Sequence, residues 1–283
     1  IDGDDIHKVS PPNKTPMKGG SVTIARSSDD GATWTDPVVI LQGSYQTAPT
    51  PVVERAGVLY RTMEDSSVGV GALVMWANVD ADLMDPRSWS RSNSIVAPKT
   101  RGGGGSDWQE GSAVIGPDGD VYNVLRVNGQ TGDFHNKAGL TKLVGSQLVF
   151  QEYVDGPFGT SKFLIRRHDL SGVYYSLSTD VTREAAAAGH IGARNHLVLG
   201  TSTDLRQWRT CATVLQDDTG FDANSSAMYT GFQYPDWVFD GDDILAAIRT
   251  AYRGARSSGT SNRLTVTRIT GFAAVCAAAA AHP

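Results

Sequence analysis

A two-strand unit recurs along this chain of 283 residues. In each copy an apolar run leads into a turn with glycine, and a second apolar run follows, as in residues 112–126 and 236–249. Apolar, β-branched runs bounded by turn residues predict antiparallel strand pairs. The turn glycines are Gly3, Gly57, Gly119, Gly172 and Gly241, so successive copies lie 54, 62, 53 and 69 residues apart.

A second strand pair with a tryptophan in or near its turn follows most copies, as in residues 73–89 and 196–208. Four strands per repeat at this period predict an all-β fold, a β-propeller of four-stranded antiparallel blades. Five repeats are visible and the first lacks its opening strand. A propeller closes a ring to remove unpaired edges, so we expect five or six blades, with sequence upstream of Ile1 completing the first.

The repeats predict one propeller domain over residues 1–272, followed by an Ala-rich tail over residues 273–283. A parallel α/β fold is disfavoured because helical patterns do not alternate with the strands. The one helix-like stretch between strands, residues 183–188, predicts one or two turns that end at Gly189. The segment 101–106 is rich in glycine and predicts a flexible connector.

Composition excludes several classes of function. A net charge of −5 gives no basic surface for nucleic acid, and no run of 18 apolar residues could span a membrane. Cys211 and Cys276 allow one disulfide or two free thiols. Glycosylation triplets at Asn13 and Asn224 favour a secreted or cell-surface protein. The six histidines show no metal-ligand spacing, and no cofactor motif is present.

Three arginines end the second strand of their repeats, namely Arg61, Arg126 and Arg249. Equivalent strand ends in a propeller face the central cavity, so these guanidiniums could form a site for a substrate carboxylate. The alternative is that each arginine forms an ion pair with an acid of a neighbouring blade and stabilises the ring.

Carboxylates and a tyrosine lie close to the same strand ends. Cleavage of a glycosidic bond needs an acid and a base or nucleophile, and a tyrosine serves as nucleophile in sialidases. Glu110 is the strongest acid/base candidate, because the nearby indole of Trp108 could raise its pKa. The other candidate catalytic residues are Tyr234, Glu64 and Asp236, each of which also has a structural interpretation.

The order Ser27-x-Asp29-x-Gly31-x-Thr33-Trp34 resembles the Asp-box, or BNR repeat, of sialidases and related β-propellers. In that family this turn lies on the outer rim of a blade, away from the active site, so its residues are expected to be structural. The segments 48–64, 80–90, 194–197, 231–237 and 249–252 resemble a bacterial group of sialidase-like BNR-repeat proteins. Gln233 and Tyr252, which lie in these segments, are candidate substrate-binding residues, as is Trp108 beside Glu110. Residues 257–264 depart from the group, because they lack its histidines and keep Asn262.

The sequence therefore predicts a secreted sialidase-like glycoside hydrolase that acts on an anionic glycan, without a metal or other cofactor. Arg61, Arg126 and Arg249 would hold the acid group, with Glu110 and Tyr234 at the reacting centre. The rival interpretation is a non-catalytic module that binds glycan or protein in an extracellular assembly. A polysaccharide lyase on a similar propeller is a third.

Overall fold

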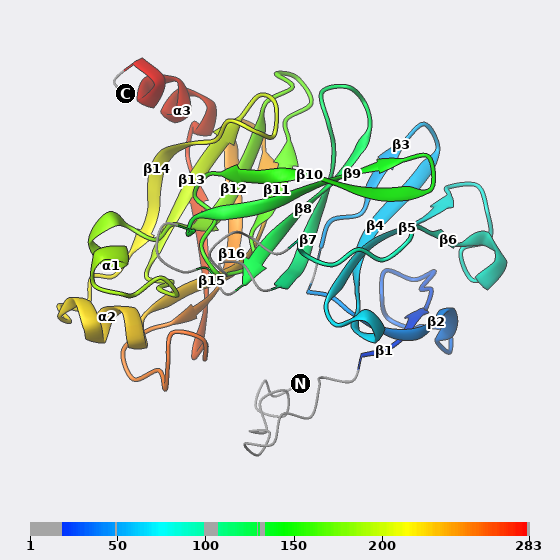
Figure 1. Ribbon diagram of the computed structural model, residues 1–283, viewed down its shortest axis with the longest axis horizontal. Coiled ribbons are helices and arrows are strands. Elements are labelled where there is room, and N and C mark those ends of the chain that lie inside the picture. The colour runs from blue at the N-terminus through cyan, green and yellow to red at the C-terminus, as the bar shows by residue number, and fades with distance from the viewer. Residues whose placement is uncertain (1–18, 49, 99–106, 129, 131–133, 282–283) are drawn as a thin grey trace.

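The computed structural model describes residues 19–48, 50–98, 107–128, 130 and 134–281, which form four antiparallel sheets (Figure 1). The first sheet contains β1 (Gly20–Ile24), β2 (Val38–Gln46), β3 (Val53–Arg55), β4 (Val58–Asp65), β5 (Gly71–Asn78) and β6 (Ser90–Arg91). The second contains β7 (Asp107–Ile115), β8 (Val121–Asn128), β9 (Lys137–Val144) and β10 (Gln147–Asp155). The third contains β11 (Leu164–Arg167), β12 (Tyr174–Thr179), β13 (His196–Ser202) and β14 (Arg209–Gln216). The fourth contains β15 (Gly231–Asp240), β16 (Asp243–Ala251) and β17 (Arg263–Ile269).

Successive sheets lie side by side as blades of a propeller arrangement. Strand β4 contacts β7, β7 contacts β11, and both β11 and β12 contact β15. Within each of the second, third and fourth sheets, strands that follow one another in the chain are neighbours. The described residues thus form an all-β propeller arrangement with four blade-like sheets, fewer than the five or six that the repeats predict. The β1–β2 hairpin joins β4 only through the pairs Tyr45–Asp65 and Gln46–Glu64.

The apolar core lies between neighbouring sheets. Trp108 of β7 packs with Val74 of β5, Val124 of β8 packs with Phe163 beside β11, and Leu177 of β12 packs with Ile248 of β16. All six side chains are fully buried. Alternation of apolar residues gives each strand one apolar face that packs against the neighbouring sheet. Burial of this face stabilises the position of the inner strand of each sheet.

Two turns bind their own aspartate and tryptophan side chains through hydrogen bonds to the backbone. Asp29 accepts from the backbone N–H of Thr33 (2.9 Å), and the indole of Trp34 donates to the carbonyl of Gly31 (3.0 Å). The hydrogen bonds from Thr33 and Ser27 lower the pKa of Asp29 to about 2. The turn before β14 repeats this arrangement, since Asp204 accepts from the backbone N–H of Gln207 and the indole of Trp208 donates to the carbonyl of Leu205.

Among the described residues three α-helices accompany the sheets, namely α1 (Arg183–Ala187), α2 (Ala223–Tyr229) and α3 (Phe272–Ala281). Helix α1 begins after Thr182, whose hydroxyl accepts from the N–H of Ala185, and it confirms the short helical stretch that the sequence predicts. Helix α3 contains most of the Ala-rich segment and packs on β14. A disulfide between Cys211 and Cys276 joins them, so the cysteines are bridged rather than free. None of the described helices is long and apolar enough to cross a membrane. Asn13 and residues 101–106 lie outside the described residues.

Candidate functional site

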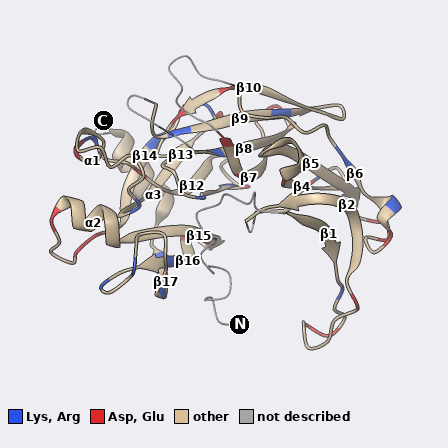
Figure 2. Cartoon of the chain, turned by 60° about the horizontal axis from the view of Figure 1, so that its bottom comes forward, with Lys and Arg blue, Asp and Glu red and all other residues tan. Residues whose placement is uncertain are grey.

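The inner hairpins of the sheets place chemically distinctive residues at equivalent positions. The pairs that close these hairpins are Arg55–Val58, Gly116–Asp120, His168–Val173 and Asp240–Asp243. Six positions before the closing pair, the second, third and fourth sheets carry Glu110, Lys162 and Tyr234. Six positions after it, the four sheets carry Glu64, Arg126, Thr179 and Arg249. In Figure 2, β7 lies near the middle of the view, with β4 on one side of it and β12 and β15 on the other.

A β-bulge shapes the backbone at both Glu110 and Tyr234. The register of β7 and β8 shifts between Gln109 and Ser112, and that of β15 and β16 shifts between Gln233 and Asp236. Glu110 has φ +51° and Tyr234 has φ +53°, in the left-handed region that non-glycine residues rarely occupy. Bulges re-aim side chains, and strained backbone of this kind clusters at functional sites. Two equivalent bulges therefore turn a carboxylate and a phenol out of their ladders.

The two re-aimed side chains meet. The hydroxyl of Tyr234 donates a hydrogen bond to Oε1 of Glu110, and Nη1 of Arg126 donates to Oε2 of Glu110 at 2.5 Å. The same Arg126 nitrogen lies 3.4 Å from the Tyr234 hydroxyl. Glu110 and Arg126 are both buried, at 8% exposure. Burial and the negative charge of Glu110 raise the pKa of Tyr234, so its phenol is protonated near neutral pH.

Two further arginines surround this pair. The guanidinium carbon of Arg249 lies 4.8 Å from the centre of the Tyr234 ring. Arg194 donates from Nη1 to the side-chain oxygen of Gln233 (2.6 Å) and from Nη2 to the carbonyl of Thr160 (3.2 Å). Burial, followed by the positive charge of Arg126, lowers the pKa of Arg194. Three cations therefore gather around one phenol and one carboxylate.

Arg61 does not belong to this group in the way the sequence predicts. It lies three residues before Glu64 on β4, where the ladder to β5 is regular, so the alternation of the strand directs the two side chains to opposite faces. The Nε of Arg61 is buried without a hydrogen-bond partner among the described residues, and burial lowers its pKa. Glu64 occupies the position that corresponds to Arg126 and Arg249.

Arg194 lies beside Gln233 in this group, although its local sequence pattern did not identify it as a candidate. It precedes β13 at the end of a loop, so it does not end an apolar run as Arg126 and Arg249 do. The backbone N–H of Phe232 donates to the carbonyl of Arg194 at 2.8 Å, which places Arg194 beside Gln233. The one signal in the sequence was its presence in a segment that resembles sialidase-like proteins.

Glu64 supports Glu110 from the first sheet. Its Oε1 accepts a hydrogen bond from the backbone N–H of Glu110 at 2.6 Å, at the residue with the left-handed backbone. Burial is the largest cause that raises the pKa of Glu64, to about 7, and the charge of Glu110 raises it further. A buried carboxyl with this pKa exchanges its proton near neutral pH.

The remaining candidate residues have other surroundings. Trp108 is fully buried and packs against Phe150, with ring centres 5.4 Å apart. Asp236 is exposed and lies 3.5 Å from Nη2 of Arg166. The hydroxyl of Tyr252 donates to Asp218, and the guanidinium of Arg263 lies 3.8 Å from the centre of its ring. Trp108 is thus part of the core, whereas Tyr252 belongs to a separate exposed cluster.

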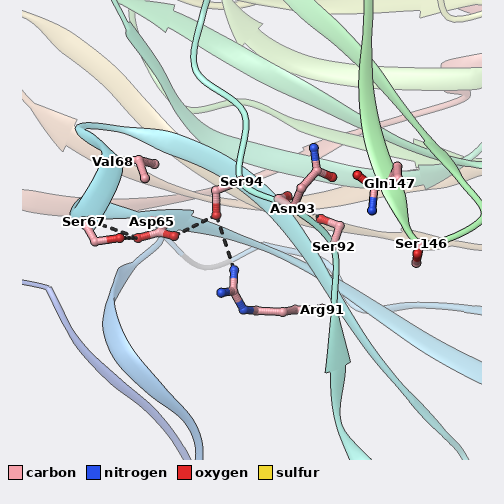
Figure 3. A pocket seen from close by; sticks show the side chains of 9 residues that line it. All are labelled: Asp65, Ser67, Val68, Arg91, Ser92, Asn93, Ser94, Ser146 and Gln147. Atoms are coloured by element: carbon pink, nitrogen blue, oxygen red, sulfur yellow. Dashed lines mark hydrogen bonds between the residues drawn. The ribbon is translucent and has the colours of Figure 1, made fainter.

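A cavity of about 560 Å³ lies away from these residues, between the first and second sheets (Figure 3). Its polar groups already bond to one another. Ser94 donates to Asp65 (2.7 Å) and accepts from Arg91 (3.5 Å), and the Asn93 amide bonds to the backbone of Leu148. The cavity is therefore a weaker candidate for a site than the Glu110–Tyr234 region. Among the described residues, no group of three or more His, Cys, Asp or Glu could hold a metal ion.

Comparisons with known proteins define the class of fold and leave the function open. No family model matches the chain, and no curated protein matches it. The intramolecular trans-sialidase from Ruminococcus gnavus, solved with oseltamivir carboxylate, is similar over 88% of this chain and 50% of that chain, with a TM-score of 0.52 and 14% identity. NanB, solved with Optactamide, is similar over 88% of this chain and 35% of that chain, with a TM-score of 0.55 and 12% identity. A protein of unknown function from Dyadobacter fermentans covers 95% of this chain and 70% of its own, with a TM-score of 0.55 and 13% identity.

The chain thus has a β-propeller arrangement that is similar to the fold of sialidases. It spans 50% of the length of the trans-sialidase and 35% of the length of NanB. At these identities the likeness shows the fold alone.

Proposed function

We propose that the chain is a sialidase-like glycoside hydrolase that acts on an anionic glycan. The observation that carries this proposal is the hydrogen bond from Tyr234 to Glu110, surrounded by Arg126, Arg194 and Arg249. A phenol bonded to a carboxylate is an activated nucleophile, and guanidiniums hold carboxylates through paired hydrogen bonds. The residues for nucleophilic attack come from more than one sheet, and so do the arginines for carboxylate binding.

In this proposal Arg194 and Arg249 bind the acid group of the substrate, while Arg126 orients Glu110. Tyr234 attacks the anomeric carbon and its proton passes to Glu110, so a glycosyl–tyrosine bond forms as the glycosidic bond breaks. The leaving oxygen takes a proton from an acid. Water later cleaves the glycosyl–tyrosine bond and gives one proton to the conjugate base of that acid, while Glu110 returns its proton to the oxygen of Tyr234. Two displacements at one carbon predict retention of the anomeric configuration.

Glu64 is our first candidate for the acid, because its pKa of about 7 keeps it partly protonated at neutral pH. Asp236 is the second candidate, because it lies two residues after Tyr234 and is exposed. Both carboxyls are already engaged, Glu64 with the N–H of Glu110 and Asp236 with Arg166.

That engagement favours the alternative function, a module that binds an anionic glycan without cleaving it. The module would use the same three arginines and would not need a free acid. We also propose that β1 and β2 belong to a fifth blade, and that the protein is secreted or exposed on the cell surface. The Cys211–Cys276 disulfide supports an oxidising compartment, and Asn224 is exposed for glycosylation.

The test is hydrolysis of 4-methylumbelliferyl glycosides of N-acetylneuraminic acid and of glucuronic acid by the purified protein, with binding of the free acids measured by calorimetry. The enzyme proposal expects turnover by the wild type and a loss of at least about 1,000-fold in Y234F with binding retained. Binding without turnover by the wild type would select the module. Absence of both would overturn the proposed site.

A further inference from the structure

Lys162 is a buried cation that the proposed mechanism does not use. Its exposure is 1%, and it is among the largest fully buried side chains of the described residues. Within the described part of the chain it donates no hydrogen bond and forms no ion pair. Lysine is rarely buried to this extent unless it is paired, so the position calls for an explanation.

The carboxylates nearest to Lys162 are already engaged. The charges of Asp236 and Glu110 both act on its ammonium group, but burial outweighs them and lowers the pKa of Lys162. Glu110 accepts hydrogen bonds from Arg126 and Tyr234, and Asp236 pairs with Arg166. Both carboxylates therefore form their ion pairs with arginines and not with Lys162.

The position of Lys162 in the fold places it in the same layer as the candidate site. It stands six positions before the closing pair of its hairpin, as Glu110 and Tyr234 do in theirs. Two residues earlier, the carbonyl of Thr160 accepts a hydrogen bond from Arg194 at 3.2 Å. Lys162 thus belongs to the ring of side chains that surrounds the centre of the propeller.

A buried and unpaired ammonium destabilises a fold, and an anion compensates it far better than a neutral hydroxyl. Arg194 and Arg249 already suffice for one carboxylate. We infer that Lys162 binds a second anionic group of the ligand, so that the preferred glycan unit carries two acidic substituents, a carboxylate and a sulfate ester. This inference rests on the proposed function, because it assumes that the first acid group binds at the arginines.

The test uses pairs of unsaturated uronic acid disaccharides from chondroitin and heparin that differ by one sulfate. Calorimetry measures their affinity for the wild type, for K162M, and for K142M as a control, since Lys142 pairs with Asp118 and Asp120 on the surface. We expect the wild type and K142M to bind one sulfated disaccharide at least about tenfold more tightly than its unsulfated partner, and K162M to lose this preference while it binds the unsulfated one equally well.

Thermal unfolding without ligand provides a second readout. Because Met removes an unpaired buried charge at similar volume, K162M is expected to raise the Tm by about 2 °C or more. A lower Tm for K162M would show a structural lysine and overturn the inference, as would a wild type that binds the unsulfated acids without a sulfate preference. A wild type that binds no acid at all would contradict the proposed function, and the inference would fall with it.

Discussion

The hydroxyl of Tyr234 donates a hydrogen bond to the carboxylate of Glu110 across a separation of 124 residues in the chain. Each residue stands at a β-bulge with a left-handed backbone, and each bulge lies at the same distance from the turn of its hairpin. The fold therefore forms the same β-bulge in two hairpins and brings the side chains of the two bulged residues into contact. The chemistry of the proposed site depends on this contact.

Substitution of the arginines should separate substrate binding from structure. R194M and R249M are expected to raise KM for an acidic substrate, or its Kd, by about 10- to 100-fold, because each removes a donor to the acid group. R61M is the matched control and should leave KM unchanged, since Arg61 points to the opposite face of β4 from Glu64. Steady-state kinetics on the three variants gives the answer, and an equal effect of R61M would contradict the assignment of Arg194 as the third arginine.

Loss of Glu110 should destabilise the protein as well as inactivate it. Glu110 and Arg126 form a buried ion pair, so E110Q leaves an unpaired buried guanidinium and is expected to cost about 3 kcal/mol in the free energy of unfolding. The double variant E110Q/R126M should be less destabilised than the sum of the single variants. Urea unfolding of the wild type, E110Q, R126M and the double variant measures this coupling. If the losses in the free energy of unfolding of the two single variants simply add in the double variant, the two side chains do not interact.

Glu64 should make stability depend on pH. Its pKa is about 7 in the folded protein and near 4.5 when unfolded, so the folded state binds more protons between these values. The free energy of unfolding should therefore fall by about 3 kcal/mol as pH rises from 4.5 through 7, and this contribution should be fully present below pH 4.5. E64Q retains an oxygen that can accept the N–H of Glu110 and should lack this part of the decline. Equal pH profiles for E64Q and the wild type would contradict the burial of an ionisable Glu64.

Reduction of the Cys211–Cys276 disulfide should weaken the fold. The bridge spans 65 residues and fastens α3 to β14, so its loss is expected to lower the free energy of unfolding by about 4 kcal/mol. Thermal unfolding with and without dithiothreitol measures the effect, and the C211A/C276A variant serves as the control that dithiothreitol should not change. An unchanged wild-type Tm after verified reduction would show that the bridge contributes nothing to stability.

Turn chemistry and strand periodicity in the sequence predicted most of the local structure. The runs around Gly119 and Gly241 form hairpins, and Glu110, Arg126, Tyr234 and Arg249 lie together. These four residues could be found because each lies just before or just after an apolar run of its strand.

The positions of Arg61 and Arg194 and the number of blades depend on tertiary contacts that local sequence patterns do not encode. Arg61 resembles Arg126 as the end of an apolar run, but it stands only three positions after the closing pair of its hairpin, whereas Arg126 stands six positions after its own. Glu64 therefore holds the equivalent position and Arg61 faces the other way. Arg194 reaches the site from a loop through tertiary contacts with Gln233 and Thr160. Blade number likewise depends on how the sheets associate, which the repeat period alone does not fix.

The most direct test of the proposed active site is covalent trapping with 2,3-difluoro-N-acetylneuraminic acid, in which fluoride leaves from the anomeric carbon as the glycosyl–enzyme bond forms. Intact-mass spectrometry and peptide mapping of the treated protein locate the adduct. Our account predicts a single sugar adduct on Tyr234, absent from Y234F and strongly reduced in E110Q. An adduct on another residue, or a wild-type protein that forms none while it binds N-acetylneuraminic acid, would contradict Tyr234 as the nucleophile.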